Sequence, residues 1–206
     1  MKNNWSVYRK HRISRTRAAA IRAVLRWVLF SAVLLIFYLF MGNPLIRGFC
    51  PLLIIPLATA VAMREGDLAA GIFGVFCGLM IDIANGVTLL GFSSLWLLIA
   101  CPIISLSTRF WVKANTLSHF VMNLIVCFVM AGMDMLFLHW VWERSQSGIS
   151  FVRVILPEYG GAVLFSIPIY WLVALIRKKL MPKEQQRLEK SAQNAEESAL
   201  ENNPEE

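Results

Sequence analysis

Charged residues are scarce in this chain: Asp, Glu, Lys and Arg make up 16% of its 206 residues, whereas hydrophobic residues make up 57%. Soluble globular domains carry about 25% charged residues. The apolar residues come in runs of about 17 or more, the length needed to cross a bilayer core about 30 Å thick. The composition therefore argues against an ordinary soluble domain and predicts an integral membrane protein without a separate soluble domain.

Motifs that carry enzymatic chemistry are also missing. The three histidines form no HExxH pattern, and no serine lies in a nucleophile elbow. The sequence has no glycine-rich phosphate loop, and its four cysteines show neither metal-type pairing nor a disulfide framework. We therefore predict that the protein is not an enzyme and has no catalytic residue, metal site or cofactor.

Acidic residues are absent before Glu65, where basic residues gather instead. The basic residues that lie before or at the start of the first apolar run are Lys2, Arg9, Lys10, Arg12, Arg15, Arg17, Arg22 and Arg26. A basic segment beside a membrane span most simply meets anionic lipid headgroups, whereas a nucleic-acid reader needs a basic surface away from the membrane. We predict that residues 1–24 form a basic cytoplasmic arm that contacts anionic lipid and binds no nucleic acid.

Six apolar runs follow, which predict an all-α integral membrane protein with six transmembrane helices in a domain over residues 25–178. The predicted spans are Leu25–Met41, Phe49–Met63, Leu68–Asn85, Gly91–Ser107, Leu117–Trp142 and Tyr159–Ile176. Pro51 and Pro56 are expected to kink the second span or to mark an irregular entrance. Residues 179–206 form a polar, acidic tail whose composition predicts disorder.

The orientation follows from the distribution of Lys and Arg, which are enriched in cytoplasmic segments. With six spans, all but three of the 20 Lys and Arg residues lie on the side that holds both termini, and the exceptions are Arg47, Arg144 and Arg153. We therefore predict a multi-pass protein of the plasma membrane with both termini in the cytoplasm.

The third predicted span carries a repeat of small residues. Gly74, Gly78, Asp82 and Gly86 recur at a spacing of four, which places them on one helix face, and Gly91 opens the next span. Glycine seams let a neighbouring helix approach closely. We predict that this face packs either an internal helix or a span of a partner, and the alternative is that the glycines merely pack the protein's own helices.

Three carboxylates are expected at similar depth in the outer part of the membrane. The third and fifth predicted spans both begin at the cytoplasmic side. Asp82 lies roughly 21 Å from the start of the third span, and Asp134 roughly 25 Å from the start of the fifth. Glu158 stands at the outer start of the sixth span. These side chains are candidates for an outward polar pocket or a partner site. The alternative is that each carboxylate caps a helix or forms a local hydrogen bond near the headgroups.

The block from Pro51 to Gly91 resembles the rod shape-determining MreD family. The resemblance rests on the early proline, the polar turn after it, the pattern Gly74-x-x-x-Gly78-x-x-x-Asp82-x-x-x-Gly86, and Leu90-Gly91. It implies a non-catalytic membrane subunit of the bacterial cell-elongation machinery. It also implies association with an MreC-like bitopic protein and, through it, with an MreB-like cytoskeleton and peptidoglycan synthases. The acidic tail departs from the expected family pattern.

The same family is similar in fold to the substrate-binding S components of energy-coupling-factor transporters, which leaves vitamin uptake as an alternative function. A vitamin pocket needs several convergent polar groups, and the spans offer mainly Asp82 and Asp134 with Asn85, Asn123 and a few hydroxyls. A small transporter or channel is a third class. It would be expected to show more intramembrane charge or an inverted repeat, and no repeat is visible.

Overall fold

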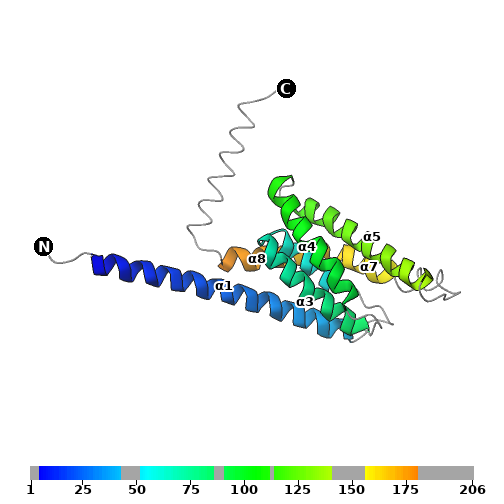
Figure 1. Ribbon diagram of the computed structural model, residues 1–206, viewed down its shortest axis with the longest axis horizontal. Helices are drawn as coiled ribbons and strands as arrows, with labels where there is room; N and C mark the ends of the chain where they lie inside the picture. Colours follow the sequence, from blue (N-terminus) through cyan, green and yellow to red (C-terminus); the bar gives the residue numbers. More distant parts are fainter. Residues whose placement is uncertain (1–4, 43–51, 86–90, 112–113, 141–155, 181–206) are drawn as a thin grey trace, which may run out of the picture. The chain divides into compact units, whose positions relative to one another are not determined.

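The structure is a computed structural model that describes residues 5–42, 52–85, 91–111, 114–140 and 156–180. The described chain is all helix, without a strand, which confirms the predicted all-α class over these residues (Figure 1). The helices are α1 Trp5–Gly42, α2 Ile54–Ala62, α3 Asp67–Asn85, α4 Phe92–Phe110, α5 Thr116–Trp140, α7 Leu156–Leu164 and α8 Ser166–Leu180.

Four of the described helices are long and apolar enough to cross a membrane. These candidate spans are Ile21–Met41 within α1, Asp67–Ala84, Phe92–Phe110 and Thr116–Leu136. A fifth span results if α7 and α8, which meet at a 44° bend, are counted as one broken span. The described chain thus offers four or five spans, and the count of six stays a prediction.

Two compact units divide the chain, one over residues 30–174 and the other formed by residues 1–29 and 175–206. The predicted boundary between arm and membrane domain, at residue 24, falls inside α1, which is helical from Trp5 to Gly42. The contacts among α2, α3, α4, α5 and α7 lie within the unit of residues 30–174.

The centre of this unit is the short helix α2. All nine of its residues are buried, and it contacts α3, α4, α5 and α7. Nine residues rise about 13 Å, well short of a bilayer core about 30 Å thick. Pro56 lies in the first turn, where the N–H that proline lacks would have had no partner within the helix. The second predicted span therefore appears, over its described residues, as a short core helix.

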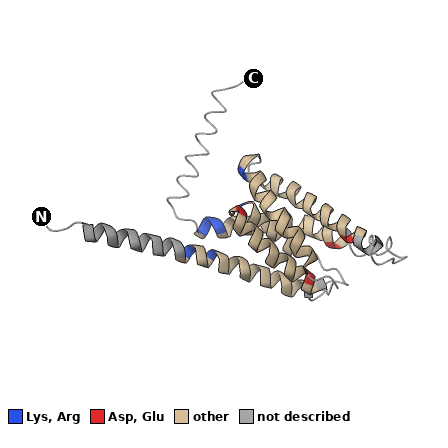
Figure 2. Ribbon diagram, viewed as in Figure 1, with Lys and Arg blue, Asp and Glu red and all other residues tan. Residues whose placement is uncertain are grey.

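Helices α3 and α4 form the closest pair in the unit and lie side by side in Figure 1. Each helix has 19 residues. In α3, α4 and α5 the charged residues stand toward the helix ends, with uncharged residues between them (Figure 2). This distribution is expected where the middle of each helix faces hydrocarbon.

The break between α7 and α8 has an identifiable cause. Pro168 has no N–H to bond the carbonyl of Leu164, and its ring clashes with that carbonyl in a straight helix. The chain bends by 44° between the two helices. Hydrogen bonds from the Phe165 N–H to Gly161 (3.0 Å) and from the Ile169 N–H to Phe165 (3.3 Å) keep helical spacing through the bend.

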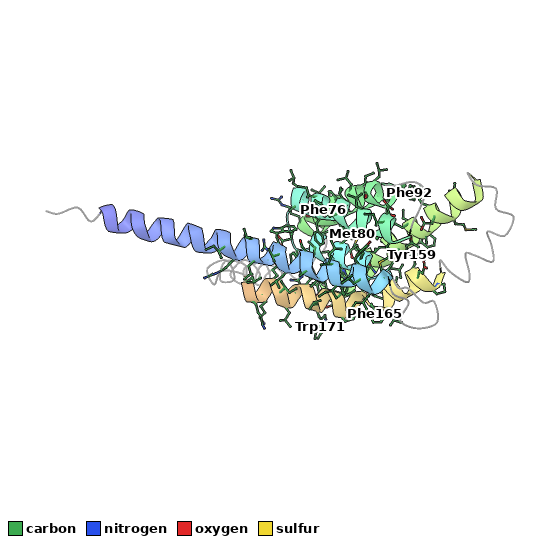
Figure 3. The ribbon with its side chains drawn as sticks, turned by 90° about the horizontal axis from the view of Figure 1, so that it is seen from below. Phe76, Met80, Phe92, Tyr159, Phe165 and Trp171 are labelled. Atoms are coloured by element: carbon green, nitrogen blue, oxygen red, sulfur yellow. The ribbon has the colours of Figure 1, made fainter. Side chains whose placement is uncertain are left out.

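Large apolar side chains cover the outside of the helices. Phe76 on α3 is 54% exposed and Trp171 on α8 is 65% exposed, and Figure 3 labels both together with Phe165 at the bend. A soluble protein rarely exposes apolar surface on this scale. The exposed faces therefore agree with helices that contact lipid.

Candidate functional site

The glycine seam of α3 is occupied by α4. A Cβ atom added at Gly74 would lie 2.7 Å from the carbonyl oxygen of Leu97 and 2.9 Å from Sγ of Cys101. A Cβ atom added at Gly78 would lie 2.7 Å from the carbonyl carbon of Ser93 and nearer still to the backbone of Ser94. Real Cβ atoms do not approach backbone this closely. Of the two predicted occupants, an internal helix is the one that packs on Gly74 and Gly78.

Asp82, one helical turn beyond Gly78, is 1% exposed and bonds the start of α4. Its Oδ2 accepts the N–H of Gly91 at 2.8 Å, and its Oδ1 accepts the N–H of Ser93 at 3.1 Å. The first N–H groups of a helix have no partner within that helix, and the positive end of the helix dipole favours a carboxylate. Asp82 therefore caps α4 from the neighbouring helix.

Gly91 completes this cap through its backbone conformation. Its φ is +102°, in the left-handed region that residues with a Cβ atom rarely adopt. This conformation occurs at the residue whose N–H reaches Oδ2 of Asp82. We call Gly74, Gly78, Asp82 and Gly91 the α3–α4 joint. The remaining residue of the predicted seam, Gly86, lies outside the described residues.

The three predicted outer carboxylates gather at one end of the unit. The Tyr159 hydroxyl donates to Oδ2 of Asp134 at 2.5 Å, and Asp134 is near enough to both Asp82 and Glu158 for their charges to interact. Glu158 is half-buried, and its carbonyl oxygen accepts the N–H of Leu52 at 3.4 Å. Asp82 and Asp134 thus each have a local partner, as the alternative interpretation of these acids expects.

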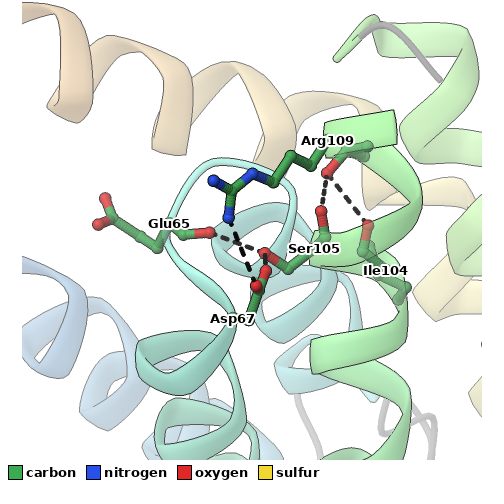
Figure 4. A network of polar contacts seen from close by, with 6 residues as sticks. Glu65, Asp67, Ile104, Ser105 and Arg109 are labelled. Atoms are coloured by element: carbon green, nitrogen blue, oxygen red, sulfur yellow. Dashed lines mark hydrogen bonds and ion pairs between the residues drawn. The ribbon is translucent and has the colours of Figure 1, made fainter. Parts of the chain in front are cut away.

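The opposite end of the α3–α4 hairpin is fastened by Ser105 (Figure 4). Its hydroxyl donates to Oδ1 of Asp67 at 2.6 Å and lies 3.0 Å from the carbonyl oxygen of Glu65. Arg109 lies 3.8 Å from Asp67, but its side chain is 70% exposed, and exposed ion pairs contribute little to stability. Ser105 therefore makes the main side-chain link between the beginning of α3 and the end of α4.

A second polar cluster lies against α2 and was not predicted from the sequence. Thr59, His119 and Asn123 are each 0% exposed. Oγ1 of Thr59 lies 3.1 Å from Nε2 of His119 and 3.3 Å from Oδ1 of Asn123. The carbonyl oxygen of Pro56 is 3.1 Å from the Thr59 hydroxyl and 3.3 Å from the same histidine nitrogen. Buried polar groups of this kind are stable when they bond one another.

Aromatic stacking extends this cluster toward one end of the unit. The ring of Tyr170 stacks on His119 with centroids 5.0 Å apart, and the guanidinium of Arg64 lies 4.6 Å from the centre of the Tyr170 ring. The Tyr170 hydroxyl donates to the carbonyl oxygen of Ala114 at 2.7 Å. A cation over an aromatic face is a favourable contact, and it is stronger away from water.

The hydrogen bonds and close contacts of these residues can hold the helices in place. Among the residues that the structure describes, no three His, Cys, Asp or Glu side chains are grouped so that they could bind a metal ion. Cys77, Cys101 and Cys127 are buried free thiols.

No family model matches the chain, and no match was found among curated proteins or among solved structures. The fold indicates only the general class of protein. The described chain is all-helical, and it has four or up to five helices that are long and apolar enough to cross a membrane, which is consistent with a multi-pass membrane protein.

Proposed function

We propose that the protein is a member of the MreD family and serves as a non-catalytic membrane subunit of the bacterial cell-elongation machinery. In this role it maintains rod shape by scaffolding an MreC-like bitopic protein, an MreB-like cytoskeleton and peptidoglycan synthases. The support is the glycine and aspartate pattern of α3, the all-helical structure and the candidate spans.

The observation that carries the proposal is the α3–α4 joint. The described residues of the family-like pattern all act on one pair of helices: Gly74 and Gly78 through close packing, Asp82 and Gly91 through a cap. These contacts fix the distance and the axial register of α3 and α4. A scaffold needs such fixed geometry, because it must present partner-binding surfaces in a constant arrangement.

The proposed topology has six spans in the plasma membrane, in a fold like that of S components, with both termini in the cytoplasm. It requires the run that contains α2 and the bent α7–α8 pair each to cross the membrane once. The basic arm then contacts anionic lipid on the cytoplasmic side. Because α4 occupies the face of Gly74 and Gly78, a partner span is expected on another face.

A second candidate function is the S component of an energy-coupling-factor vitamin transporter. The observation that favours it is the gathering of Asp82, Asp134 and Glu158 at one end of the unit, with Tyr159 among them. In that function, Asp134 and Glu158 would contact a polar ligand, while the cap on α4 would keep Asp82 in place.

Depletion of the protein in its own host tests the proposed function. We expect depleted cells to lose rod shape and become round, and we expect the wild-type gene supplied in trans to restore rods. A depleted strain that stays rod-shaped, but requires added vitamin for growth, would contradict the elongation role and favour the transporter function.

A further inference from the structure

The end of the hairpin where α3 begins and α4 ends carries an exposed ion pair. Nη1 of Arg109 lies 3.8 Å from Oδ2 of Asp67, and the two side chains are 70% and 38% exposed (Figure 4). Ser105 donates to Oδ1 of the same carboxylate, which holds Asp67 in place. The pair therefore presents a positioned negative group and a positive group side by side at the surface.

Large apolar residues flank both members of this ion pair. Leu68 follows Asp67 in the chain and is 79% exposed, and Phe110 follows Arg109 and is 69% exposed. Trp111, at the C-cap of α4, is 90% exposed. The guanidinium of Arg109 lies 5.9 Å from the centre of the Phe110 ring. A surface that combines charge with exposed aromatic rings is typical of the boundary between membrane and water, where tryptophan is enriched.

The length of the two helices places the ion pair at that boundary. Helices α3 and α4 each have 19 residues and are candidate membrane spans. A helix of this length rises roughly 28 Å, close to the thickness of a bilayer core of about 30 Å. Asp67 is the first residue of α3, and Arg109 is the last but one of α4. When the hairpin spans the bilayer, both charges therefore lie at the level of the lipid headgroups.

We propose that Asp67 and Arg109 bind the headgroup of a zwitterionic aminophospholipid. The guanidinium donates to the lipid phosphate, the primary ammonium of the headgroup donates to the Asp67 carboxylate, and the acyl chains lie against Leu68 and Phe110.

The charges of the site explain the choice of lipid. A headgroup without an ammonium would bring its phosphate beside Asp67 with no cation to offset the repulsion between the two anions. Opening the direct ion pair costs little, because exposed ion pairs are weak. The inference rests on the multi-pass membrane character of the chain, and it does not depend on the proposed role in cell elongation.

Native mass spectrometry of the full-length protein tests the headgroup site. The protein, purified in mild detergent, is given equal amounts of phosphatidylethanolamine and phosphatidylcholine with the same acyl chains. Both lipids are zwitterionic, but the choline group has no N–H to donate. We expect the wild type to retain more phosphatidylethanolamine, and Asp67→Asn to lower the ratio of the two retained lipids about threefold, the scale of one exposed ion pair. The amide oxygen in this variant can still accept the Ser105 hydroxyl, so the hairpin should stay folded.

A second variant tests the phosphate contact against a matched control. We expect Arg109→Ala to retain less of both lipids at an unchanged melting temperature, because its side chain is exposed. Lys179→Ala removes another exposed basic residue, in the last turn of α8, and should retain lipid as the wild type does.

Three results would overturn the proposal. The first is an unchanged lipid ratio in Asp67→Asn, and the second is an equal loss of lipid in Lys179→Ala and Arg109→Ala. The third is a preference of the wild type for phosphatidylglycerol over phosphatidylethanolamine that Arg109→Ala lowers and Asp67→Asn leaves unchanged. This third result would assign the surface to anionic lipid instead.

Discussion

At the scale of single residues, Asp82 shows how a carboxylate is kept inside an apolar helix. It is 1% exposed, yet both of its oxygens accept backbone N–H groups at the start of α4. Asp82 therefore has a structural role, because its hydrogen bonds join α3 to α4. In the proposed function, Asp82 matters because its hydrogen bonds set the geometry of the α3–α4 pair.

Loss of the Asp82 cap should destabilise the fold. We expect Asp82→Ala to cost about 1–3 kcal/mol of unfolding free energy, because the N–H groups of Gly91 and Ser93 lose their acceptor. Asp82→Asn should cost less, since its amide oxygen still accepts one of the two bonds. Thermal unfolding in detergent measures both effects, and an Asp82→Ala variant as stable as the wild type would show that the cap contributes nothing.

At the scale of elements, the α3–α4 hairpin is fixed at both ends and along its length. Gly74 and Gly78 bring the backbones together, Asp82 caps one end, and Ser105 bonds the turn at the other end. The two 19-residue helices therefore form a rigid pair, against which the short helix α2 packs.

Gly78→Ala tests the close packing against a matched control. The new methyl group would overlap the backbone of Ser93 and Ser94, so we expect the helices to separate and the protein to lose about 1–3 kcal/mol of stability. Gly132→Ala is the control on α5, since a Cβ atom there would meet nothing within 4 Å. The control should be neutral or slightly stabilising, because alanine favours helix over glycine by up to about 1 kcal/mol.

Equal melting temperatures for these two variants would contradict the packing of α4 on Gly78. If close packing also underlies the proposed scaffold, Gly78→Ala should reduce the rescue of rod shape in depleted cells, whereas Gly132→Ala should rescue fully. Microscopy of the two complemented strains measures this difference.

Ser105→Ala tests the other end of the hairpin. Loss of the hydroxyl removes its hydrogen bond to Asp67 and its contact with the carbonyl oxygen of Glu65, and we expect a cost of about 1 kcal/mol. Arg109→Ala is the comparison, and we expect almost no effect because this ion pair is exposed. Both variants are measured in the same unfolding assay. A larger loss of stability in Arg109→Ala than in Ser105→Ala would contradict the conclusion that Ser105 makes the main link between the two helices.

At the scale of the whole molecule, helix placement could largely be predicted from hydrophobic runs. The third span was expected over residues 68–85 and is observed as Asp67–Asn85. The structure of the second apolar run was harder to predict, because its composition does not reveal that α2 is only nine residues long and wholly buried. The bend between α7 and α8 had a readable signal in Pro168, which disrupts a straight helix.

The polar sites also differ in how far they could be predicted from the sequence. The glycine spacing predicted a close helix contact because all its members lie on one helix, where spacing alone sets the face. The cluster of Thr59 and His119 escaped prediction because its members are 60 residues apart and meet only through tertiary packing. Asn123, four residues after His119 in an apolar run, was the one local signal of it.

The proposed topology makes a prediction at this same scale. An even number of spans puts both termini on one side of the membrane, and the enrichment of Lys and Arg in cytoplasmic segments predicts that this side is the cytoplasm. We expect a green fluorescent protein fused after residue 206 to fluoresce and an alkaline phosphatase fused at the same site to be inactive. An active phosphatase fusion would place the C-terminus outside the cytoplasm and would contradict the proposed topology.

Recovery of partners tests the proposed function most directly. The tagged protein is purified from its own host in mild detergent, and the proteins that accompany it are identified by mass spectrometry. We predict enrichment of an MreC-like bitopic protein together with peptidoglycan synthases, relative to an unrelated tagged membrane protein. Enrichment of a transporter T component with its ATPases, in place of these proteins, would contradict the elongation role and establish vitamin uptake as the better account.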